Sequence, residues 1–253
     1  MRSNTAKTKM LAGKPAFGYS LALGSPLAAE ILASCGIDFL LFDTQHGSFG
    51  PDSIISSLIA ASAGSAIPMA RVARNDYTMI GRLLDEGTMG IVVPMVENRE
   101  DAQRAADACH LPPDGTRSWG WGRATALGEN YSEEINSQVF VAVQIESITA
   151  VDNAEAILSV PGVDGCWVGP ADLALSLGIH PQDRFNEDRH FRATERVLEA
   201  CRNTGKVAGY AGSSIEEALA LAERGFRYIT CGSDGGFLRS GAMAGIQALA
   251  LDS

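Results

Sequence analysis

Two acidic residues stand at equivalent places in the chain, each directly after an apolar run. Glu146 ends the segment 139–146 (Val-Phe-Val-Ala-Val-Gln-Ile-Glu), and Asp172 ends the segment 163–172 (Val-Asp-Gly-Cys-Trp-Val-Gly-Pro-Ala-Asp). Both runs are typical of buried parallel strands. Because the carboxyl ends of parallel strands open on one face of an α/β protein, the two carboxylates can bind one hard divalent cation. The sequence therefore predicts a metal site.

A histidine and an arginine follow two other strand-like runs. The segment 43–47 reads Asp-Thr-Gln-His-Gly. Asp43 could accept from one imidazole nitrogen of His46 and leave the other for proton transfer. The run that begins at Ile67 delivers Arg71, whose planar fork of donors suits a carboxylate or a developing enolate oxygen. Each has a plainer explanation, since His46 could cap the following turn and Arg71 could pair with an acid in a loop.

The Gly-Pro-Ala-Asp turn at 169–172 opens a short predicted helix. The free amides at a helix start attract an anion, and here they lie beside the candidate ligand Asp172. A bound 2-oxo acid would use both features, with its carboxylate on the amides and the cation and its keto oxygen on the cation and Arg71. The alternative is an ordinary helix N-cap made by Asp172.

Apolar, β-rich runs alternate with helical stretches, and these elements must position the polar residues. Eight such runs occur, at 17–21, 38–42, 67–72, 90–93, 139–145, 163–168, 206–210 and 227–230. Eight β/α units without a break in composition predict a single (β/α)8 TIM barrel over residues 1–253, with an open doubly wound sheet as the alternative. Ser25-Pro26 predicts a helix start, and Ser214 with Glu217 predicts a capping box.

One connection, residues 110–137, is too long for a plain loop and carries Trp119. Loops of this length inside a compact domain usually serve a function. Only one of the four histidines, His46, follows a strand-like run. The other three lie in polar or proline-containing connections and are predicted to be peripheral: His110, His180 and His190.

Composition limits the classes of function. The chain has 253 residues, of which 46% are hydrophobic, and a formal net charge of −10. Such an acidic chain argues against nucleic acid as a partner, because phosphate binding needs clustered Lys and Arg. The five cysteines show no paired spacing, and no run approaches eighteen apolar residues. These features predict a cytoplasmic enzyme that has no membrane segment and acts on a small molecule.

Several blocks of the sequence, taken together and in order, resemble one known family. The blocks are 43–47, 70–72, 117–118 with 123–124, 144–146 and 168–173. They resemble the HpcH/HpaI aldolase family over nearly the whole chain. The resemblance implies a (β/α)8 barrel that holds Mg2+ or Mn2+, with Co2+ also possible, through a Glu and an Asp.

By motif, the family's metal ligands fall on Glu146 and Asp172. Its histidine and supporting acid correspond to His46 and Asp43, and its enolate-stabilising arginine to Arg71. The resemblance further implies that Gln144 lies beside the metal. The substrate carboxylate would be received by the backbone of Gly169, Pro170 and Ala171. Apart from the resemblance, Trp119 and Trp121 in the long loop, with Phe49 and residues of a neighbouring subunit, are predicted to shape the aldehyde pocket.

The resemblance also implies shared sites in a homo-oligomer, a trimer or a hexamer. Family members often borrow an acid from a neighbouring subunit, and Asp85 is the matching residue here. They are commonly hexamers that exchange the last helix, which would be 235–251 in this chain. One departure concerns Gln45, because many family aldolases carry Glu-His-Gly where this chain has Gln-His-Gly. This change bears on substrate choice or on the pKa of the histidine.

The implied reaction is the cleavage of a 4-hydroxy-2-oxo acid into an aldehyde and pyruvate. The cation would chelate the C1 carboxylate and C2 carbonyl, the base would remove the C4 hydroxyl proton, and the C3–C4 bond would break to leave pyruvate enolate. No lysine follows a strand in a position suited to a Schiff base, since Lys206 precedes the seventh strand.

Three alternatives stay open. Decarboxylation of oxaloacetate, or trapping of the enolate as in macrophomate synthase, needs no new residues. An acyl-CoA lyase related to the citrate lyase β-subunit would need a basic nucleotide-binding surface. A phosphosugar isomerase or synthase would instead bind phosphate at the glycine-rich turns 209–213 and 231–236 without any metal.

Overall fold

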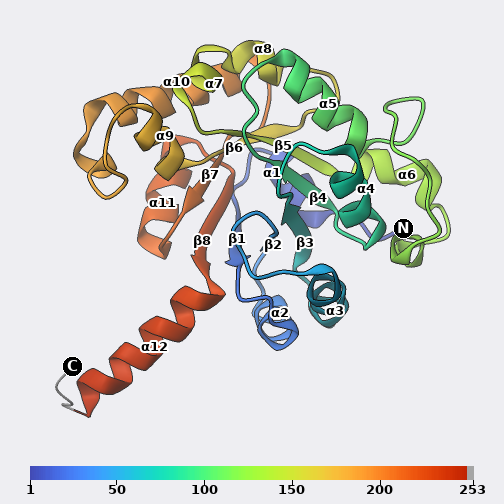
Figure 1. Ribbon diagram of the computed structural model, residues 1–253, viewed down its shortest axis with the longest axis horizontal. Helices are drawn as coiled ribbons and strands as arrows, with labels where there is room; N and C mark the ends of the chain where they lie inside the picture. Colours follow the sequence, from blue (N-terminus) through green and yellow to red (C-terminus); the bar gives the residue numbers. More distant parts are fainter. Residues whose placement is uncertain (250–253) are drawn as a thin grey trace.

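The computed structural model describes residues 1–249 of the chain. Eight parallel strands close into a barrel in the order β1 to β8 (Figure 1). The strands are β1 (Ala16–Leu21), β2 (Phe39–Asp43), β3 (Ile67–Arg71), β4 (Gly90–Val93), β5 (Phe140–Ile145), β6 (Gly165–Val168), β7 (Gly209–Gly212) and β8 (Tyr228–Ser233). The predicted TIM barrel is confirmed, and the open doubly wound sheet is wrong.

Helices surround the barrel and alternate with its strands. They are α1 (Thr5–Leu11), α2 (Pro26–Ala33), α3 (Pro51–Ala61), α4 (Tyr77–Asp85), α5 (Arg99–Cys109), α6 (Tyr131–Gln138), α7 (Ile148–Asp152), α8 (Ala154–Leu158), α9 (Pro170–Ser176), α10 (Asp188–Thr204), α11 (Ile215–Arg224) and α12 (Asp234–Ala248), with short 3-10 helices η1 (Arg123–Leu127) and η2 (Arg184–Asn186). The long connection after α5 therefore contains η1 and α6.

The helix boundaries follow the punctuation of the sequence with one exception. Ser25 caps α2, and Pro26 occupies its first position, as predicted. Ser214 caps α11 by accepting from the Glu217 N–H at 3.1 Å. The second half of the predicted capping box is wrong, because the Glu217 carboxylate accepts from the N–H and the hydroxyl of Ser213, both at 2.8 Å. At Ser213 one Glu217 carboxylate oxygen accepts two hydrogen bonds, whereas the predicted capping box would give it only one, from the Ser214 N–H.

Strand alternation divides the core into two parts. Side chains that point outward from the strands pack against the helices and form the larger cluster. Inward-pointing side chains fill the barrel, and α1 closes its amino-terminal end with Met10. The inner cluster includes Phe39 and Leu41 of β2, Met69 of β3 and Trp167 of β6. Because alternate residues of a strand share a face, these same rows determine which side chains reach the mouth of the barrel.

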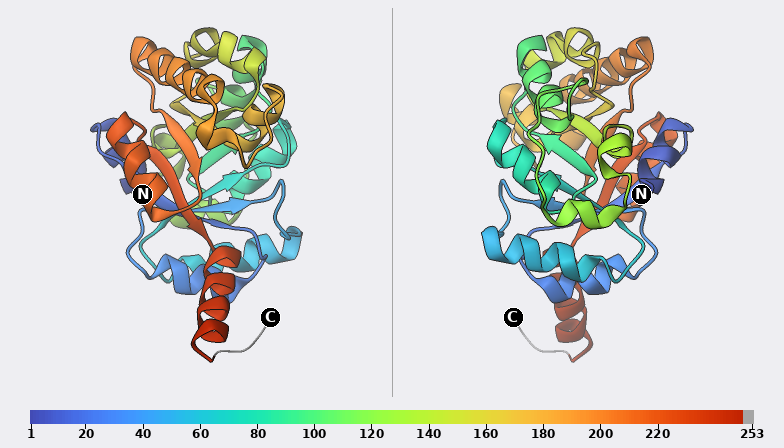
Figure 2. Two further views of the ribbon diagram at one scale, coloured as in Figure 1. Left: turned by 90° about the vertical axis from the view of Figure 1, so that its left-hand side faces the viewer. Right: turned by 90° about the vertical axis from the view of Figure 1, so that its right-hand side faces the viewer.

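The last helix, α12, leaves the barrel instead of packing on it (Figures 1 and 2). Its start is fixed, because the Asp234 carboxylate accepts from the N–H groups of Ala22 and Leu23 at 3.0 Å. Beyond this turn the helix projects into solvent and exposes large apolar side chains. These are Phe237, Leu238, Met243 and Ile246. The end of the predicted helix, residues 250 and 251, lies outside the described residues.

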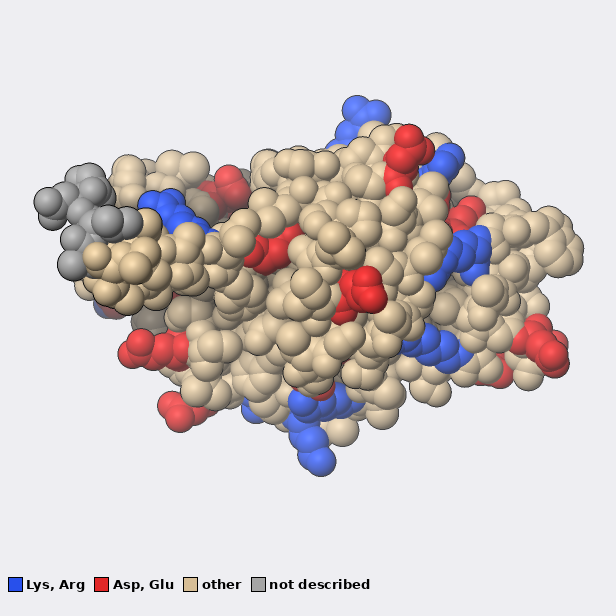
Figure 3. Space-filling model, turned by 90° about the horizontal axis from the view of Figure 1, so that it is seen from below, with Lys and Arg blue, Asp and Glu red and all other residues tan. Residues whose placement is uncertain are grey.

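Acidic and basic side chains are scattered over the face seen from below, without a continuous field of Lys and Arg (Figure 3). None of the helices within residues 1–249 combines the length and hydropathy needed to span a membrane. The cytoplasmic location stays a prediction.

Candidate active site

Asp43 and Arg71 meet at the carboxyl ends of β2 and β3, where they are direct neighbours in the strand register. Asp43 continues the inward row of Phe39 and Leu41, and Arg71 continues the row of Met69. Their side chains form a two-pronged ion pair, with Nε to Oδ1 at 3.0 Å and Nη2 to Oδ2 at 2.5 Å. Paired donors of this kind fix both groups in orientation as well as in distance.

The same carboxylate also organises the loop that carries His46. Asp43 Oδ1 accepts from the backbone N–H groups of Gln45 at 3.0 Å and of His46 at 3.2 Å. Burial raises the pKa of Asp43, but Arg71 and these N–H groups outweigh it and hold the pKa below its usual value. The predicted contact from Asp43 to the imidazole is absent within residues 1–249, because its oxygens are taken by the guanidinium and the loop backbone.

Glu146 follows β5 and is 96% buried, with 4% of its surface exposed. Its Oε1 accepts from the Met95 N–H at 2.8 Å, and its Oε2 accepts from the Gln144 amide. Burial raises the pKa of Glu146 to about 7, and the nearby charge of Asp172 adds to the rise, against the opposing effects of the Met95 N–H, Arg71 and Gln144. A buried carboxylate with a raised pKa is typical of a functional site.

Met95, in the loop after β4, was not singled out from the sequence. It is the only residue other than glycine with a positive φ, 54°, within residues 1–249, and its N–H is the group that binds Glu146. Such a backbone conformation is energetically unfavourable for a residue that has a Cβ, and it tends to occur at functional sites. No residue-type signal could have revealed it, because the contact is made by the main chain.

Asp172 lies in the first turn of α9, whose N-cap is Gly169. The alternative in which Asp172 is an ordinary cap is therefore wrong. Gly169 approaches Glu146 closely, because a Cβ added to it would lie 2.7 Å from Glu146 Oε2 and from Gln144 Nε2. A side chain at this position would therefore collide with Glu146 and Gln144. Leu173 makes the first bond of the helix, to Gly169 O, so the N–H groups of Ala171 and Asp172 have no partner inside it.

The donors at this place fit a hard divalent cation. Glu146 and Asp172 supply carboxylate oxygens, and Gln144 Oε1 is a buried oxygen without a hydrogen-bond partner in the described chain. No group of three or more His, Cys, Asp or Glu side chains arranged for a metal is found within residues 1–249. Two carboxylates, with water and substrate completing the shell, match the way Mg2+ is bound in enzymes.

Two further side chains complete the mouth of the barrel. Trp167 of β6, which the sequence did not single out, faces Arg71, whose Cζ lies 5.5 Å from the centre of the indole ring. This contact adds a cation–π interaction to the ion pair with Asp43. His46 is exposed on the loop after β2, and Gln45 Oε1 is buried there without a partner in residues 1–249. Arg71 is thus held by Asp43 and Trp167. The imidazole of His46, by contrast, is open to solvent.

Comparison with known proteins identifies the family. The model of the HpcH/HpaI aldolase/citrate lyase family matches residues 17–241. The chain belongs to this family. It is 35% identical over 236 residues to a hydroxypyruvate/pyruvate aldolase of Roseobacter denitrificans, covering 91% of each chain. It is also 35% identical over 245 residues to a 4-hydroxy-2-oxo-heptane-1,7-dioate aldolase of Escherichia coli, covering 95% of this chain and 93% of the relative.

A solved structure extends the comparison to three dimensions. An HpcH/HpaI aldolase/citrate lyase family protein from Burkholderia cenocepacia superposes with a TM-score of 0.92 at 33% identity. The match covers 98% of this chain and 100% of that structure. The barrel therefore has the architecture of an HpcH/HpaI family member.

Two of the predicted site residues, Asp85 and Trp119, lie elsewhere in the protomer. Asp85 ends α4 on the outside of the barrel, where Oδ1 pairs with Arg117 Nη2 at 2.7 Å. Arg117 is buried and also donates to the Tyr131 hydroxyl. Trp119 packs edge-on against Tyr131 and Trp121. Neither Asp85 nor Trp119 joins the cluster at the strand ends of its own chain.

The histidines predicted to be peripheral are not all so. His110 and His190 are both buried, and only His180 is exposed. His190 lies in the first turn of α10, and its Nε2 lies 3.1 Å from the carbonyl oxygen of Pro170 in α9. Burial lowers the pKa of His190. The prediction failed for His190 because the residues directly before it are polar and suggest a loop. The helix α10 starts there, and His190 lies on its buried face.

Both turns proposed as phosphate sites are already occupied by the chain's own carboxylates. The Glu217 carboxylate binds the N–H of Ser213 after β7. After β8 the Asp234 carboxylate binds the N–H groups of Gly235 and Leu23. A phosphate at either turn would meet a negative charge in place of free N–H groups. This observation disfavours the metal-free phosphosugar enzyme.

Lysine occurs at four positions, and all four belong to the amino-terminal end of the barrel. Lys7, Lys9 and Lys206 bind groups that directly precede β5, β2 and β6. Lys14 lies two residues before β1. No lysine within residues 1–249 therefore lies at the strand ends where Asp43 and Glu146 are found, in agreement with the absence of a Schiff-base residue.

Proposed function

We propose that this HpcH/HpaI family member is a class II aldolase, which cleaves 4-hydroxy-2-oxo acids into pyruvate and an aldehyde with the help of a divalent cation, Mg2+ or Mn2+. The observation that carries the proposal is the pair Glu146 and Asp172 beside the Arg71–Asp43 ion pair. The names of the two aldolase relatives support the same reaction class. The substrate class is a small 2-oxo acid.

Glu146 and Asp172 would hold the cation, and Gln144 and the Met95 N–H would fix the Glu146 carboxylate in place. When bound, the cation would act as a Lewis acid that polarises the substrate carbonyl. The backbone of Gly169, Pro170 and Ala171 would receive the substrate carboxylate. The small space left by the absent side chain of Gly169 supports this placement.

Arg71 would stabilise the negative charge that develops on the enolate oxygen of pyruvate. Its Nε and Nη2 are committed to Asp43, whereas Nη1 has no hydrogen-bond partner in residues 1–249. A guanidinium that Asp43 and Trp167 fix in place, while Nη1 has no partner in the described chain, is a preorganised donor, which needs little rearrangement as charge develops.

His46 would move the proton of the C4 hydroxyl. Its backbone is fixed by Asp43, while its ring is exposed at the mouth of the barrel. Asp43 therefore acts by holding the His46 loop and Arg71 together, a different role from the one inferred from the spacing alone. Asp85 of a neighbouring subunit would assist the ring, since Asp85 lies on the outer surface of its own protomer.

The homo-oligomer would be built partly by exchange of α12. A helix that follows β8 would ordinarily cover the barrel between α11 and α2, but α12 projects away from it (Figure 2). The side of the barrel that α12 leaves uncovered holds an apolar cavity of about 170 Å3, which is lined in part by Phe17, Ile215 and Leu219. Large apolar side chains are also exposed on α12, such as Leu238. A second copy's α12 matches this surface in chemistry, and a hexamer is the expected assembly.

The proposal is tested by pyruvate release from a panel of 4-hydroxy-2-oxo acids and oxaloacetate. Chelated protein would be assayed with and without added Mg2+ or Mn2+, alongside Glu146→Ala. We expect cleavage that the cation restores and the substitution abolishes. Cleavage indifferent to the chelator would contradict the cation-dependent reaction. Activity confined to oxaloacetate would make the protein a decarboxylase, which needs the same residues.

A further inference from the structure

The short helix α9 carries Asp172, and few hydrogen bonds from other elements hold its first turn. The Gly169 N–H donates to Ile145 O at 3.2 Å, which ties the turn to β5. Within residues 1–249, His190 is the only side chain that hydrogen-bonds to the backbone of residues 169–172, through Nε2 and Pro170 O at 3.1 Å. Apart from the packing of the buried Pro170 and Leu173, the orientation of this turn therefore depends on a single side-chain hydrogen bond from another helix.

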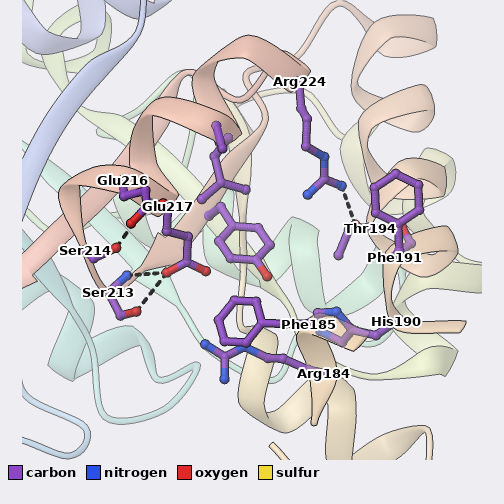
Figure 4. A pocket seen from close by; sticks show the side chains of 13 residues that line it. Arg184, Phe185, His190, Phe191, Thr194, Ser213, Ser214, Glu216, Glu217 and Arg224 are labelled. Carbon is purple, nitrogen blue, oxygen red and sulfur yellow. Dashed lines mark hydrogen bonds between the residues drawn. The ribbon is translucent and has the colours of Figure 1, made fainter. Parts of the chain in front are cut away.

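The geometry of this bond fixes the role of the imidazole. A carbonyl oxygen can only accept, so Nε2 carries the proton and donates it. His190 is 96% buried, with 4% of its surface exposed, and stands on α10, a helix of 17 residues. On another side the ring borders a cavity of about 430 Å3 between α10 and α11, lined also by Arg184 and Tyr210 (Figure 4). A long packed helix thus holds a seven-residue one at the active site.

We propose that His190 is a positioning residue of the active site, which sets the place of Asp172 relative to Glu146 by holding Pro170. This inference rests on the proposed function, because it takes both acids as ligands of the cation. Gly169 already lies against Glu146 Oε2, so a small rotation of the turn changes the separation of the two carboxylates. Mg2+ requires near-ideal octahedral geometry, and groups behind the ligands commonly influence the affinity for Mg2+ or Mn2+.

The test compares Mn2+ affinity of metal-free protein, followed by electron paramagnetic resonance, among four proteins. His190→Phe removes the donor, and His190→Gln keeps an amide donor close to the place of Nε2. The fourth, His110→Phe, is a matched control, because His110 is also buried and bonds a backbone oxygen, Ala106 O, at 2.8 Å, but outside the site. We expect His190→Phe to weaken Mn2+ binding about tenfold or more, with the other two near the unaltered protein.

Steady-state kinetics give a second readout. We expect His190→Phe to raise the KM for the 2-oxo acid more than it lowers kcat, and His190→Gln to restore both. If His190→Phe does not fold, His190→Asn replaces it, because its amide ends short of Pro170 O.

The outcomes separate the two proposals. Unaltered Mn2+ affinity in folded His190→Phe overturns the positioning role, and so does an equal loss in His110→Phe, which would indicate general destabilisation. Failure of the unaltered protein to bind Mn2+ overturns the proposed function itself.

Discussion

Glu146 shows how a single residue can be unfavourable for the fold and necessary for the site. Its carboxylate is almost fully buried, and its pKa is raised to about 7 mainly by burial. Near neutral pH the metal-free protein therefore carries a costly charge that a bound cation would compensate.

The pH dependence of stability follows from this raised pKa. Since the folded-state pKa lies above the ordinary value of 4.5, the folded protein is favoured below pH 4.5 and loses this contribution as the pH rises to about 7. We expect Glu146→Gln to raise the free energy of unfolding of the metal-free protein above that of the unaltered protein. This gain should be larger at pH 8 than at pH 5 by roughly 2 kcal/mol. Urea unfolding of both proteins at the two pH values measures the difference. A difference that does not change with pH would contradict the raised pKa.

A second prediction at this scale concerns the cation. Because protonation of Glu146 competes with metal binding, we expect the Mn2+ affinity to fall as the pH drops through about 7. Titrations between pH 6 and pH 8 would measure it. An affinity that stays constant over this range would show that Glu146 is ionised throughout.

Gly169 gives a steric prediction. A Cβ at this position would lie 2.7 Å from Glu146 Oε2, far inside van der Waals contact. We expect Gly169→Ala to lower kcat at least about tenfold and to destabilise the protein by about 1–3 kcal/mol, because Glu146 and Gln144 must shift. Gly241→Ala is the control, since no atom lies within 4 Å of its added Cβ. Equal behaviour of the two variants would disprove the close packing.

At the scale of elements, much of the architecture could be predicted and some contacts could not. Strand periodicity predicted all eight strands. The alternation of side chains along β2 and β3 is enough to predict that Asp43 and Arg71 continue the inward-pointing rows. The beginning of β7 was misplaced, because Val207 makes only an isolated bridge to Gly165. The roles of Met95 and His190 stayed hidden, since each acts through one backbone group brought near by the fold.

Asp85 of α4, which pairs with Arg117 in the loop after α5, allows a test of sites shared between subunits. If Asp85 serves a neighbour's site, Asp85→Asn and Glu146→Gln should each be inactive alone. Hetero-oligomers of the two should regain activity, because some sites then combine both unaltered residues. Purification of mixed oligomers through two different tags, followed by the pyruvate assay, measures this recovery.

A neighbouring acid supplies the control for this experiment. Glu86→Gln alters the residue next to Asp85, whose partner Arg82 is on the same helix, and should leave activity unchanged. Mixed oligomers without any recovered activity would place Asp85 outside the shared site.

At the scale of the whole molecule, the proposed assembly depends on α12. Leu238 and Met243 are exposed in the protomer, so charging them should not disturb the barrel itself. We expect Leu238→Glu with Met243→Glu to yield smaller species than the unaltered protein, as measured by light scattering after size-exclusion chromatography. Gln247→Glu, which adds a charge on the same helix, should keep the assembly. An unchanged mass in the double variant would contradict a role of α12 in the assembly.

The distribution of lysines has a practical consequence for handling the protein. Every lysine lies near the amino-terminal end of the barrel, on the side opposite to Glu146 and Arg71. Reagents that couple to amines would therefore attach the enzyme to a solid support by its closed end. The mouth of the barrel would face the solution, so an immobilised preparation should keep its substrate access without any engineered attachment point.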